Sequence, residues 1–324
     1  MRALVCRVLG HDTPLAIEDV SLPEPPTGQV LVSVRAAAVN FPDALMLEGK
    51  YQVKPPMPFT PGCELAGIVS AVGTDVKHVK AGDRVLAVVP HGAFAEQALC
   101  DIARVVPIPD SVPFESAAAF MFTYGTSYHA LKDRGQLAQG ETLLVLGAGG
   151  GVGLAAVELG KAMGARVIAA ASTEAKLAAC REHGADETID YTREDLRERV
   201  KVLTEGKGVD VVYDPVGGAF AEPAFRSLAW KGRHLVVGFA NGDVPKLPMN
   251  LPLLKGASLV GVFWGEFTRR EAALNRANMA ELVGWLAAGR LKPHIGARYP
   301  LERGAEAIAQ VRDRHAIGKV LVIP

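Results

Sequence analysis

The sequence has little cysteine and no net charge. Its four cysteines, Cys6, Cys63, Cys100 and Cys180, are scattered and form no Cys-x-x-Cys pair. This argues against a disulfide framework or a structural zinc lobe and fits a reducing compartment. Lysine plus arginine and aspartate plus glutamate number 35 each, so no overall field favours nucleic acid or an anionic membrane surface. A small molecule is therefore the expected partner.

The sequence also gives little support for a membrane segment. No sustained apolar run precedes His11, so the start does not resemble a signal peptide and is typical of a first strand. Residues 143–157 are apolar and uncharged, but five of them are glycines, and Glu158 and Lys161 follow closely. That composition argues against a membrane span. We expect a cytoplasmic protein that needs no membrane.

What the sequence does contain is an apolar run that ends in glycines, LLVLGAGGGVG at residues 143–153. The apolar part is typical of a strand buried on both faces of a parallel sheet, and residues 154–161 have helical apolar spacing. Glycines let the main chain approach a ligand, and a helix that begins there offers unpaired N–H groups and its positive dipole end to an anion. The stretch predicts a pyrophosphate-binding turn.

The glycine spacing matches the dinucleotide fingerprint Gly-x-Gly-x-x-Gly except at its first position, where Ala148 replaces glycine. Residues 165–171 are typical of a second buried strand after the helix, which gives a βαβ unit of the expected size. The alternative is a glycine-rich turn that binds nothing. We predict that the following residues bind the cofactor: Ala148, Gly150, Gly151, Val152 and Gly153.

The chain is long enough for two domains with separate cores, since it has 324 residues, of which 49% are hydrophobic and 22% charged. Residues 1–113 contain short β-type runs between turn residues, which predict a compact all-β unit. The expected strands are Ala3–Leu9, Gln29–Val34, Leu65–Val72, Arg84–Val89 and Phe94–Leu99. Alanine-rich helical spacing begins at Glu115, so a domain boundary is expected near that residue.

From residue 141 to residue 263, strands and helices alternate, which is the sequence form of a doubly wound parallel α/β sheet. Strands are expected at residues 143–146, 166–170, 187–189, 209–213, 233–237 and 258–263. Helices are expected at residues 173–183, with Ser172 as N-cap, and at residues 194–204, 219–229, 271–288 and 302–312, before a last strand at 319–323. The last ~55 residues are too few for a third domain. We expect them to complete the first one.

The order of these features resembles the medium-chain dehydrogenase/reductase superfamily over essentially the whole chain. Five motifs resemble its zinc-independent NADPH:quinone oxidoreductase (zeta-crystallin-like) branch: VNFPDA at 39–44, PGCELAG at 61–67, GDRV at 82–85, GAFAE at 92–96 and TSYHAL at 126–131. The resemblance implies a Rossmann-type dinucleotide-binding domain at residues 119–264. It also implies a GroES-like β-rich catalytic domain at residues 1–118, completed by a C-terminal return at residues 265–324.

The resemblance also bears on metal. Zinc alcohol dehydrogenases of the same superfamily need a cysteine, a histidine and a second cysteine where this chain has Asn40, Cys63 and Phe122. One thiolate cannot hold catalytic zinc, which takes three protein ligands and an open position. A loop with four clustered cysteines is missing too, because the chain runs directly from Glu96 to Val105. The resemblance therefore implies a metal-free reductase, with Cys63 as a small buried apolar residue.

The end of the predicted second strand bears on the choice of cofactor. NAD-preferring folds usually place an acid there, ~20 residues past the turn, for the ribose 2′-hydroxyl. This chain has Ala170-Ala171-Ser172 instead. With no carboxylate to repel it, a 2′-phosphate is tolerated, and Ser172 and Lys176 offer it hydrogen bonds. The sequence therefore favours NADPH, although Ser172 as a helix cap and Lys176 as a solvated charge are ordinary alternatives.

The resemblance adds further residues to the expected cofactor site. It implies that Tyr191 and Arg314 surround the 2′-phosphate, while Glu174, within the next helix, is a decoy that would favour NAD. The residues implied to flank the nicotinamide are Gly238, Phe239, Phe263 and Trp264, with Thr126 near the ring. Core packing is the alternative for Phe263 and Trp264, and an ordinary charge near the C-terminal helix is the alternative for Arg314.

Hydride transfer needs the nicotinamide carbon and the acceptor about 3–3.5 Å apart, and a neutral donor suffices to polarise a carbonyl oxygen. Asn40 and Tyr51 are the candidate donors, on either side of a loop that contains Asp43. In the family these positions line the active site. Asn40 and Asp43 as turn caps, and Tyr51 as a half-buried aromatic, are the structural alternatives.

These features lead to a metal-free NADPH-dependent reductase of quinones or activated alkenes. An enoyl-thioester (acryloyl-CoA-like) reductase is a close alternative, for which Lys50 with Lys54, or Arg269 with Arg270, could contribute to a phosphate channel. A non-catalytic NADPH-binding sensor or scaffold is a third. The resemblance also implies a homodimer, with the strand at residues 258–263 as the contact. Loops build the substrate pocket, so the fold does not name the acceptor.

Overall fold

The computed structural model describes residues 1–11 and 13–324, which divide into two compact units. Unit 1 contains Met1–Phe122 and Leu286–Pro324, and unit 2 contains Thr123–Trp285. The sequence-based boundaries, after residues 118 and 264, therefore differ from the units of the structure. The boundary expected after residue 264 lies after Trp285 in the structure, because α10 (Ala272–Ala287) is held by hydrogen bonds to Lys132, near the start of unit 2. The Lys132 ammonium reaches Asn278 Oδ1 at 3.1 Å and Glu281 Oε2 at 2.8 Å.

Unit 1 is built on a seven-stranded sheet with the order β14-β15-β3-β4-β5-β7, in which β6 also pairs with β3. Its strands are β3 (Gln29–Val39), β4 (Glu64–Val72), β5 (Arg84–Val88), β6 (Gln97–Asp101), β7 (Val105–Pro107), β14 (Ile295–Pro300) and β15 (Lys319–Ile323). The last strand, β15, pairs antiparallel with β3, with Val320 opposite Val39. The C-terminal segment thus completes the first unit, as expected.

Smaller elements surround this sheet. A two-stranded sheet consists of β1 (Arg2–Cys6) and β2 (Leu15–Asp19). The helices of unit 1 are α1 (Phe41–Leu47), α2 (Phe114–Ala118) and α11 (Gly304–Arg312), with the short 3-10 turns η1 (Ile102–Arg104) and η4 (Leu301–Arg303). α11 contacts α1, β14 and β15. The core draws on distant segments, since Val32, Leu65, Val85 and Leu301 are all fully buried in one cluster.

Unit 2 has a six-stranded parallel sheet with the order β10-β9-β8-β11-β12-β13, which confirms the doubly wound fold. Its strands are β8 (Thr142–Val145), β9 (Arg166–Ala171), β10 (Glu187–Asp190), β11 (Val209–Asp214), β12 (Leu228–Val236) and β13 (Ser258–Gly261). The uninterrupted apolar pattern of β8 follows from its place in the middle of the sheet, where Leu143, Leu144 and Val145 are fully buried.

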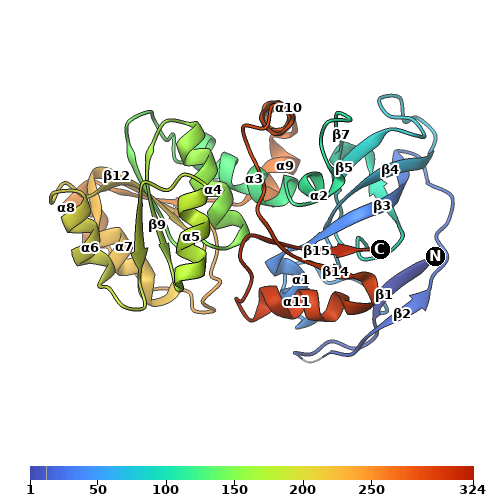
Figure 1. Ribbon diagram of the computed structural model, residues 1–324, viewed down its shortest axis with the longest axis horizontal. Coiled ribbons are helices and arrows are strands. Elements are labelled where there is room, and N and C mark those ends of the chain that lie inside the picture. The colour runs from blue at the N-terminus through green and yellow to red at the C-terminus, as the bar shows by residue number, and fades with distance from the viewer. Residues whose placement is uncertain (12) are drawn as a thin grey trace. The chain divides into compact units, whose positions relative to one another are not determined.

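Helices precede, join and follow the strands of unit 2. They are α3 (Met121–Tyr128), which continues into a π-helical turn η2 (His129–Arg134), α4 (Gly151–Ala162), α5 (Glu174–Glu182), α6 (Leu196–Leu203), α7 (Ala221–Arg226), α8 (Asn250–Lys255), α9 (Trp264–Arg270) and α10, with the 3-10 turn η3 (Gly218–Phe220). α4 and α5 contact each other and β9, and they lie side by side over the sheet (Figure 1). α6 and α7 form a second contacting pair.

Several expected element boundaries shift. The strand expected at Ala3–Leu9 ends at Cys6, and the one expected at Phe94–Leu99 is β6, Gln97–Asp101. Thr173 rather than Ser172 caps α5, because the Thr173 hydroxyl accepts a hydrogen bond from the Lys176 amide at 3.3 Å. In the described part of the chain, no helix combines the length and the apolar composition that a bilayer span requires.

Candidate functional site

The cofactor residues predicted in unit 2 gather at one edge of its sheet. Because all six strands are parallel, their carboxyl ends meet there, and the strand order reverses between β8 and β11. A crevice at such a reversal is where sheets of this kind bind ligands. The glycine turn follows β8, Ser172 follows β9, Tyr191 follows β10, and Gly238 and Phe239 come two and three residues after β12.

The glycine turn uses its glycines for two separate reasons. Gly147 has a left-handed backbone, with φ 56°, which favours glycine. Gly153 lies in the first turn of α4, where an added Cβ would be 2.3 Å from the Gly147 carbonyl oxygen. Ala148 is fully buried, and its amide donates to the Ala170 carbonyl at 3.0 Å. The position that requires glycine for its conformation is therefore Gly147, so alanine at 148 is no defect in the turn.

Gly149 leaves room for Lys176. A Cβ added to Gly149 would be 2.5 Å from Lys176 Cβ and 2.7 Å from its Cγ. The aliphatic stem of Lys176, from the first turn of α5, therefore packs directly on the glycine turn. Helix α4 begins just beyond it, with Gly150 as N-cap and Gly151 as first residue. A lysine and a helix N-terminus thus come together beside one loop, an arrangement suited to phosphate groups.

Polar residues that the sequence analysis missed hold this edge together. Ser127 of α3 donates to the Val152 carbonyl at 2.9 Å and lies 2.8 Å from the Tyr213 hydroxyl. Asp214, the last residue of β11, accepts from the amides of Val216 and Gly217 at 2.9 and 2.8 Å. The signal that could have found Asp214 is the run Asp-Pro-Val-Gly-Gly directly after a buried strand.

The residues implied to flank the nicotinamide have different surroundings. Trp264 is 7% exposed and packs on α3, because a Cβ added to Gly125 would be 2.8 Å from the indole ring. Phe263, its neighbour, is 61% exposed. The structure thus favours core packing for the Trp264 side chain. Phe239 is partly exposed and lies against Gly217, and Thr126 is half-buried on α3.

In unit 1, Asn40 belongs to a buried ionic cluster. Its Oδ1 accepts from the Lys319 ammonium at 2.6 Å, and its Nδ2 donates to Glu64 Oε2 at 2.9 Å and to the Ala38 carbonyl at 3.3 Å. Lys319 and Glu64 form an ion pair at 3.1 Å with side chains that are 5% and 0% exposed. Both polar atoms of the Asn40 side chain are therefore bound by protein groups, and both of its N–H donors are used. The sequence analysis missed Lys319 because a lone lysine at a strand start resembles a solvated charge.

Asp43 and Tyr51 lie near this cluster. Asp43 is fully buried, and its Oδ2 accepts a hydrogen bond from the backbone N–H of Asn40 at 2.7 Å, which makes it a cap of α1. Burial raises the pKa of Asp43 to about 7, although the hydrogen bond from the backbone N–H of Asn40 lowers it. Tyr51 is half-buried, and burial, then the nearby Cys63 and Asp43, raise the pKa of its hydroxyl. Of the three expected catalytic residues, Tyr51 alone is partly exposed.

A catalytic zinc ion does not fit this cluster. The Asn40 amide is engaged as described, and Phe122 contributes only its backbone amide, which donates to Glu64 Oε1 at 2.7 Å. Burial, above all other causes, raises the pKa of the Cys63 thiol well above its usual value, which opposes the thiolate that zinc binds. No three His, Cys, Asp or Glu side chains among residues 1–11 and 13–324 are grouped to hold a metal ion.

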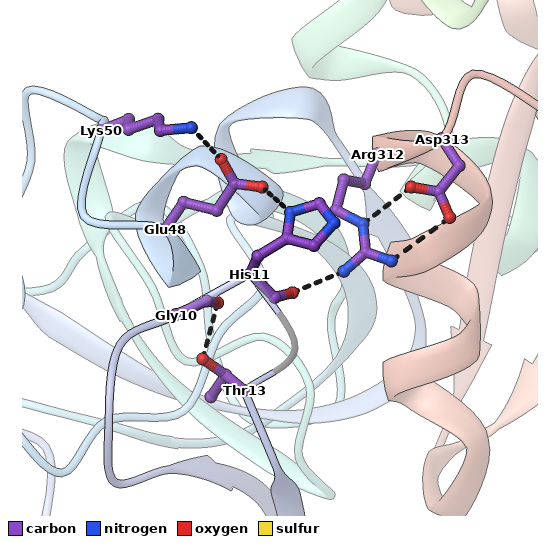
Figure 2. Close-up of polar contacts among 7 residues, drawn as sticks. All are labelled: Gly10, His11, Thr13, Glu48, Lys50, Arg312 and Asp313. Carbon is purple, nitrogen blue, oxygen red and sulfur yellow. Dashed lines mark hydrogen bonds and ion pairs between the residues drawn. The ribbon is translucent and has the colours of Figure 1, made fainter.

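A second polar cluster of unit 1 lies beside the segment that carries Tyr51. Figure 2 shows Glu48, the C-cap of α1, between Lys50 and His11, each 2.8 Å away. Lys50, and then His11, hold the pKa of Glu48 below its usual value. Arg312, at the end of α11, donates to the His11 carbonyl at 2.6 Å and pairs with Asp313. The next residue, Arg314, is thus in unit 1, and unit 2 holds the other predicted cofactor residues.

Comparison with known proteins agrees with this architecture. The alcohol dehydrogenase GroES-like domain model matches residues 26–110, and the zinc-binding dehydrogenase model matches residues 151–280. A quinone oxidoreductase-like protein 2 homolog of Nematostella vectensis is 40% identical over 99% of this chain and 88% of its own length. The human synaptic vesicle membrane protein VAT-1 homolog is 34% identical over 93% of this chain and 80% of its own length.

A solved structure is also similar. The Escherichia coli quinone oxidoreductase, in a crystal structure complexed with NADPH, superimposes with a TM-score of 0.93 and 30% identity, covering 100% of both chains. The two family models, the relatives that align along nearly the whole chain and this structure agree on the fold and its organisation. The chain belongs to the medium-chain dehydrogenase/reductase superfamily and, within it, to the quinone oxidoreductase-like proteins.

Proposed function

We propose that this protein is a zinc-independent, NADPH-dependent oxidoreductase that transfers hydride to a quinone or another α,β-unsaturated carbonyl. The observation that carries the proposal is the packing of Lys176 on the glycine turn, beside a strand end that has no carboxylate. A cation there suits a 2′-phosphate, and the missing acid removes the usual partner of an NAD ribose. The NADPH complex of the E. coli relative supports the same choice of cofactor.

The chain's own residues would hold the cofactor in three places. The glycine turn, residues 147–153, and the N-terminus of α4 bind the pyrophosphate. Ser172, Lys176 and Tyr191 bind the 2′-phosphate. Gly238, Phe239, Phe263 and Thr126 lie beside the nicotinamide, and the buried Trp264 supports them from the core. When bound, NADPH supplies the hydride.

On the acceptor side we assign Tyr51 the contact with the carbonyl oxygen. A tyrosine hydroxyl is neutral at physiological pH, and burial raises the pKa of Tyr51 further, so it can act as the neutral donor that suffices to polarise the carbonyl. Asn40, whose two side-chain N–H donors are already used, holds the start of α1 instead of donating to the acceptor. Asp43, buried behind Asn40, holds the same turn.

The enoyl-thioester alternative finds little support in three of the four charges expected to serve it. Lys50 pairs with Glu48 at 2.8 Å. Arg269 and Arg270 both pair with Glu266 at 2.8 Å, and they lower the pKa of Glu266 to about 2. Cations already paired with carboxylates attract coenzyme A phosphates less strongly than unpaired ones. The relatives are named quinone oxidoreductase-like proteins, a name that does not state a catalytic activity, so the non-catalytic alternative is tested as well.

Turnover assays separate these functions. NADPH oxidation is measured with 1,4-benzoquinone, 9,10-phenanthrenequinone and crotonyl-CoA, with Tyr51→Phe as the variant and Lys77→Met, an exposed charge of unit 1, as the matched control. We expect the wild-type protein to reduce the quinones and Tyr51→Phe to lose that activity. Lys77→Met should keep the wild-type activity. Turnover of crotonyl-CoA alone would establish the thioester alternative. NADPH binding without turnover of any acceptor would establish a sensor or scaffold.

We further propose a homodimer that acts in the cytoplasm. β13 is an edge strand of the sheet in unit 2 and carries Leu259, which is 54% exposed. Trp230 of the adjacent β12 is 69% exposed and packs on Gly256, at the end of α8, where Leu253 is 79% exposed. An apolar edge of this kind suits a second copy of the chain. Sedimentation of Leu259→Lys tests this, since an unchanged dimer would contradict the contact.

A further inference from the structure

The N-terminal turn of α5 carries an acid beside the proposed 2′-phosphate site. Glu174 is the first residue of the helix, two positions before Lys176 and two after Ser172, and its side chain is 76% exposed. A free carboxylate at this place would repel a phosphate, which carries about two negative charges, and would accept from a ribose hydroxyl. By position alone, Glu174 would favour NADH.

The Glu174 carboxylate is paired, however. Its Oε1 accepts a short hydrogen bond from Arg181 Nη2. Arg181 lies seven residues later on the same helix, about 10 Å further along its axis. The other nitrogen of its guanidinium, Nη1, donates to the Thr188 hydroxyl of β10 at 3.2 Å. Arg181 is thus anchored to the sheet and draws the acid along α5, away from the strand ends.

Asp190, at the end of β10, is a second acid at this edge that is bound by other protein groups. Its Oδ1 accepts from the amide and the hydroxyl of Thr192 at 3.0 and 2.6 Å, and Arg193 lies 3.6 Å from its Oδ2. Glu174 and Asp190 are therefore each bound by neighbouring protein groups. Lys176 is the cation that packs on the glycine turn at this edge.

We propose that Arg181 sets the preference for NADPH over NADH by neutralising Glu174 and holding it away from the 2′-phosphate. Arg181 is a positioning residue in this inference, because it acts through Glu174 and does not touch the cofactor. The inference rests on the proposed NADPH-dependent function. It differs from the role assigned to Lys176, which is direct contact with the phosphate.

Its physical basis is the dependence of electrostatic energy on net charge and distance. Removing the guanidinium restores a full negative charge at the helix N-terminus and frees the side chain to turn toward the phosphate. NADH lacks the 2′-phosphate, so the same change costs its binding less and adds an acceptor for its 2′-hydroxyl. Because the pair is largely exposed, added salt should reduce the effect.

The test is a double-mutant cycle with Arg181→Gln, Glu174→Gln and the double variant. Dissociation constants for NADPH and NADH are measured by fluorescence titration, at low and at high salt. Lys161→Gln is the matched control, because it removes the cation of another partly exposed ion pair of unit 2, Lys161 with Asp186 at 2.8 Å. Those residues end α4 and precede β10, so they lie at the opposite edge of the sheet.

We expect Arg181→Gln to weaken NADPH binding about three- to tenfold at low salt while NADH binding stays the same or tightens. Glu174→Gln alone, and Lys161→Gln, should leave the ratio of the two constants within about twofold. The double variant should regain the wild-type ratio. If the double variant stays as weak as Arg181→Gln, Arg181 acts directly and the inference is wrong, and an equal loss for both cofactors refutes it as well.

The wild-type protein separates this inference from the function on which it rests. A wild-type chain that binds NADPH no better than NADH contradicts the proposed cofactor, and the inference falls with it. A wild-type chain that prefers NADPH, together with an Arg181→Gln variant of unchanged preference, contradicts the inference alone. Circular dichroism of each variant, compared with the wild type, identifies a loss of binding that comes from unfolding.

Discussion

Replacing Lys319 with methionine should destabilise unit 1 strongly. Lys319 is 4% exposed, and its ammonium is held by the Val39 carbonyl, Asn40 Oδ1 and Glu64 Oε2 at 3.2, 2.6 and 3.1 Å. Methionine keeps most of the length and volume but removes the charge, which leaves the Glu64 carboxylate buried without a cation. Breaking a buried ion pair from one side costs about 3–5 kcal/mol. That is a large part of a typical folding free energy of about 5–15 kcal/mol.

The assay must report on unit 1. The three tryptophans, Trp230, Trp264 and Trp285, all belong to unit 2, so their fluorescence follows the wrong part of the chain. Hydrogen exchange of peptides from β3 and β15, the strands that bring Lys319 to Asn40, gives the opening free energy directly. We expect about 3 kcal/mol less protection there in Lys319→Met, with Lys77→Met unchanged. A loss below about 1 kcal/mol would refute the reasoning.

A second substitution sharpens the test. Adding Glu64→Gln to Lys319→Met removes the carboxylate charge that the first substitution leaves buried without a cation, so it should restore part of the lost stability. A double variant no more stable than Lys319→Met would mean that the ion pair is not the cause.

Three further predictions follow from the structure. Gly149→Ala should raise the dissociation constant of NADPH about tenfold and that of NADH less, because its Cβ would be 2.5 Å from Lys176 Cβ, and equal losses in fluorescence titration would contradict this. Gly153→Ala should weaken both cofactors alike, because its Cβ would be 2.3 Å from the Gly147 oxygen. Since burial raises the pKa of Asp43 from 3.8 to about 7, its contribution to stability is complete below about pH 4 and is lost as pH rises through 7. At about 1.4 kcal/mol for each pH unit between the two pKa values, the loss amounts to about 4 kcal/mol. The free energy of unfolding of Asp43→Asn, measured in urea, should therefore not fall with pH in this way. Parallel pH curves for the variant and the wild type would contradict the prediction.

The parallel sheet could be predicted from the sequence because its rules are local. An apolar run such as β8 can be buried on both faces only in the middle of a sheet, and the alternation with helices fixes the parallel topology. The final strand was also predicted with its observed bounds, Lys319–Ile323. Boundaries that depend on one side chain were less certain: Ser172 and Thr173 are both good caps, and the choice between them is made by the Lys176 amide.

The ionic cluster of unit 1 could not be predicted, because its contacts span the chain. Lys319 lies 279 residues from Asn40 and 255 from Glu64, and its single charge at the start of a strand has no local signature. Family resemblance pointed to Asn40 as a position in the site. It did not reveal that both polar atoms of the amide are already used by Lys319 and Glu64, which is what moves the expected contact with the acceptor to Tyr51.

Cofactor preference shows the same limit from the other direction. The sequence places Glu174 two residues after Ser172, and an acid at that spacing has an ambiguous meaning: it favours NAD if it is free and has little influence if it is neutralised. The deciding residue, Arg181, lies two helical turns away and is anchored by Thr188 on another strand. A fingerprint that records residue types near the strand end cannot include that pairing. The charge that a phosphate would meet is therefore a property of the folded edge, and it depends on which acids have found partners as much as on which acids are present.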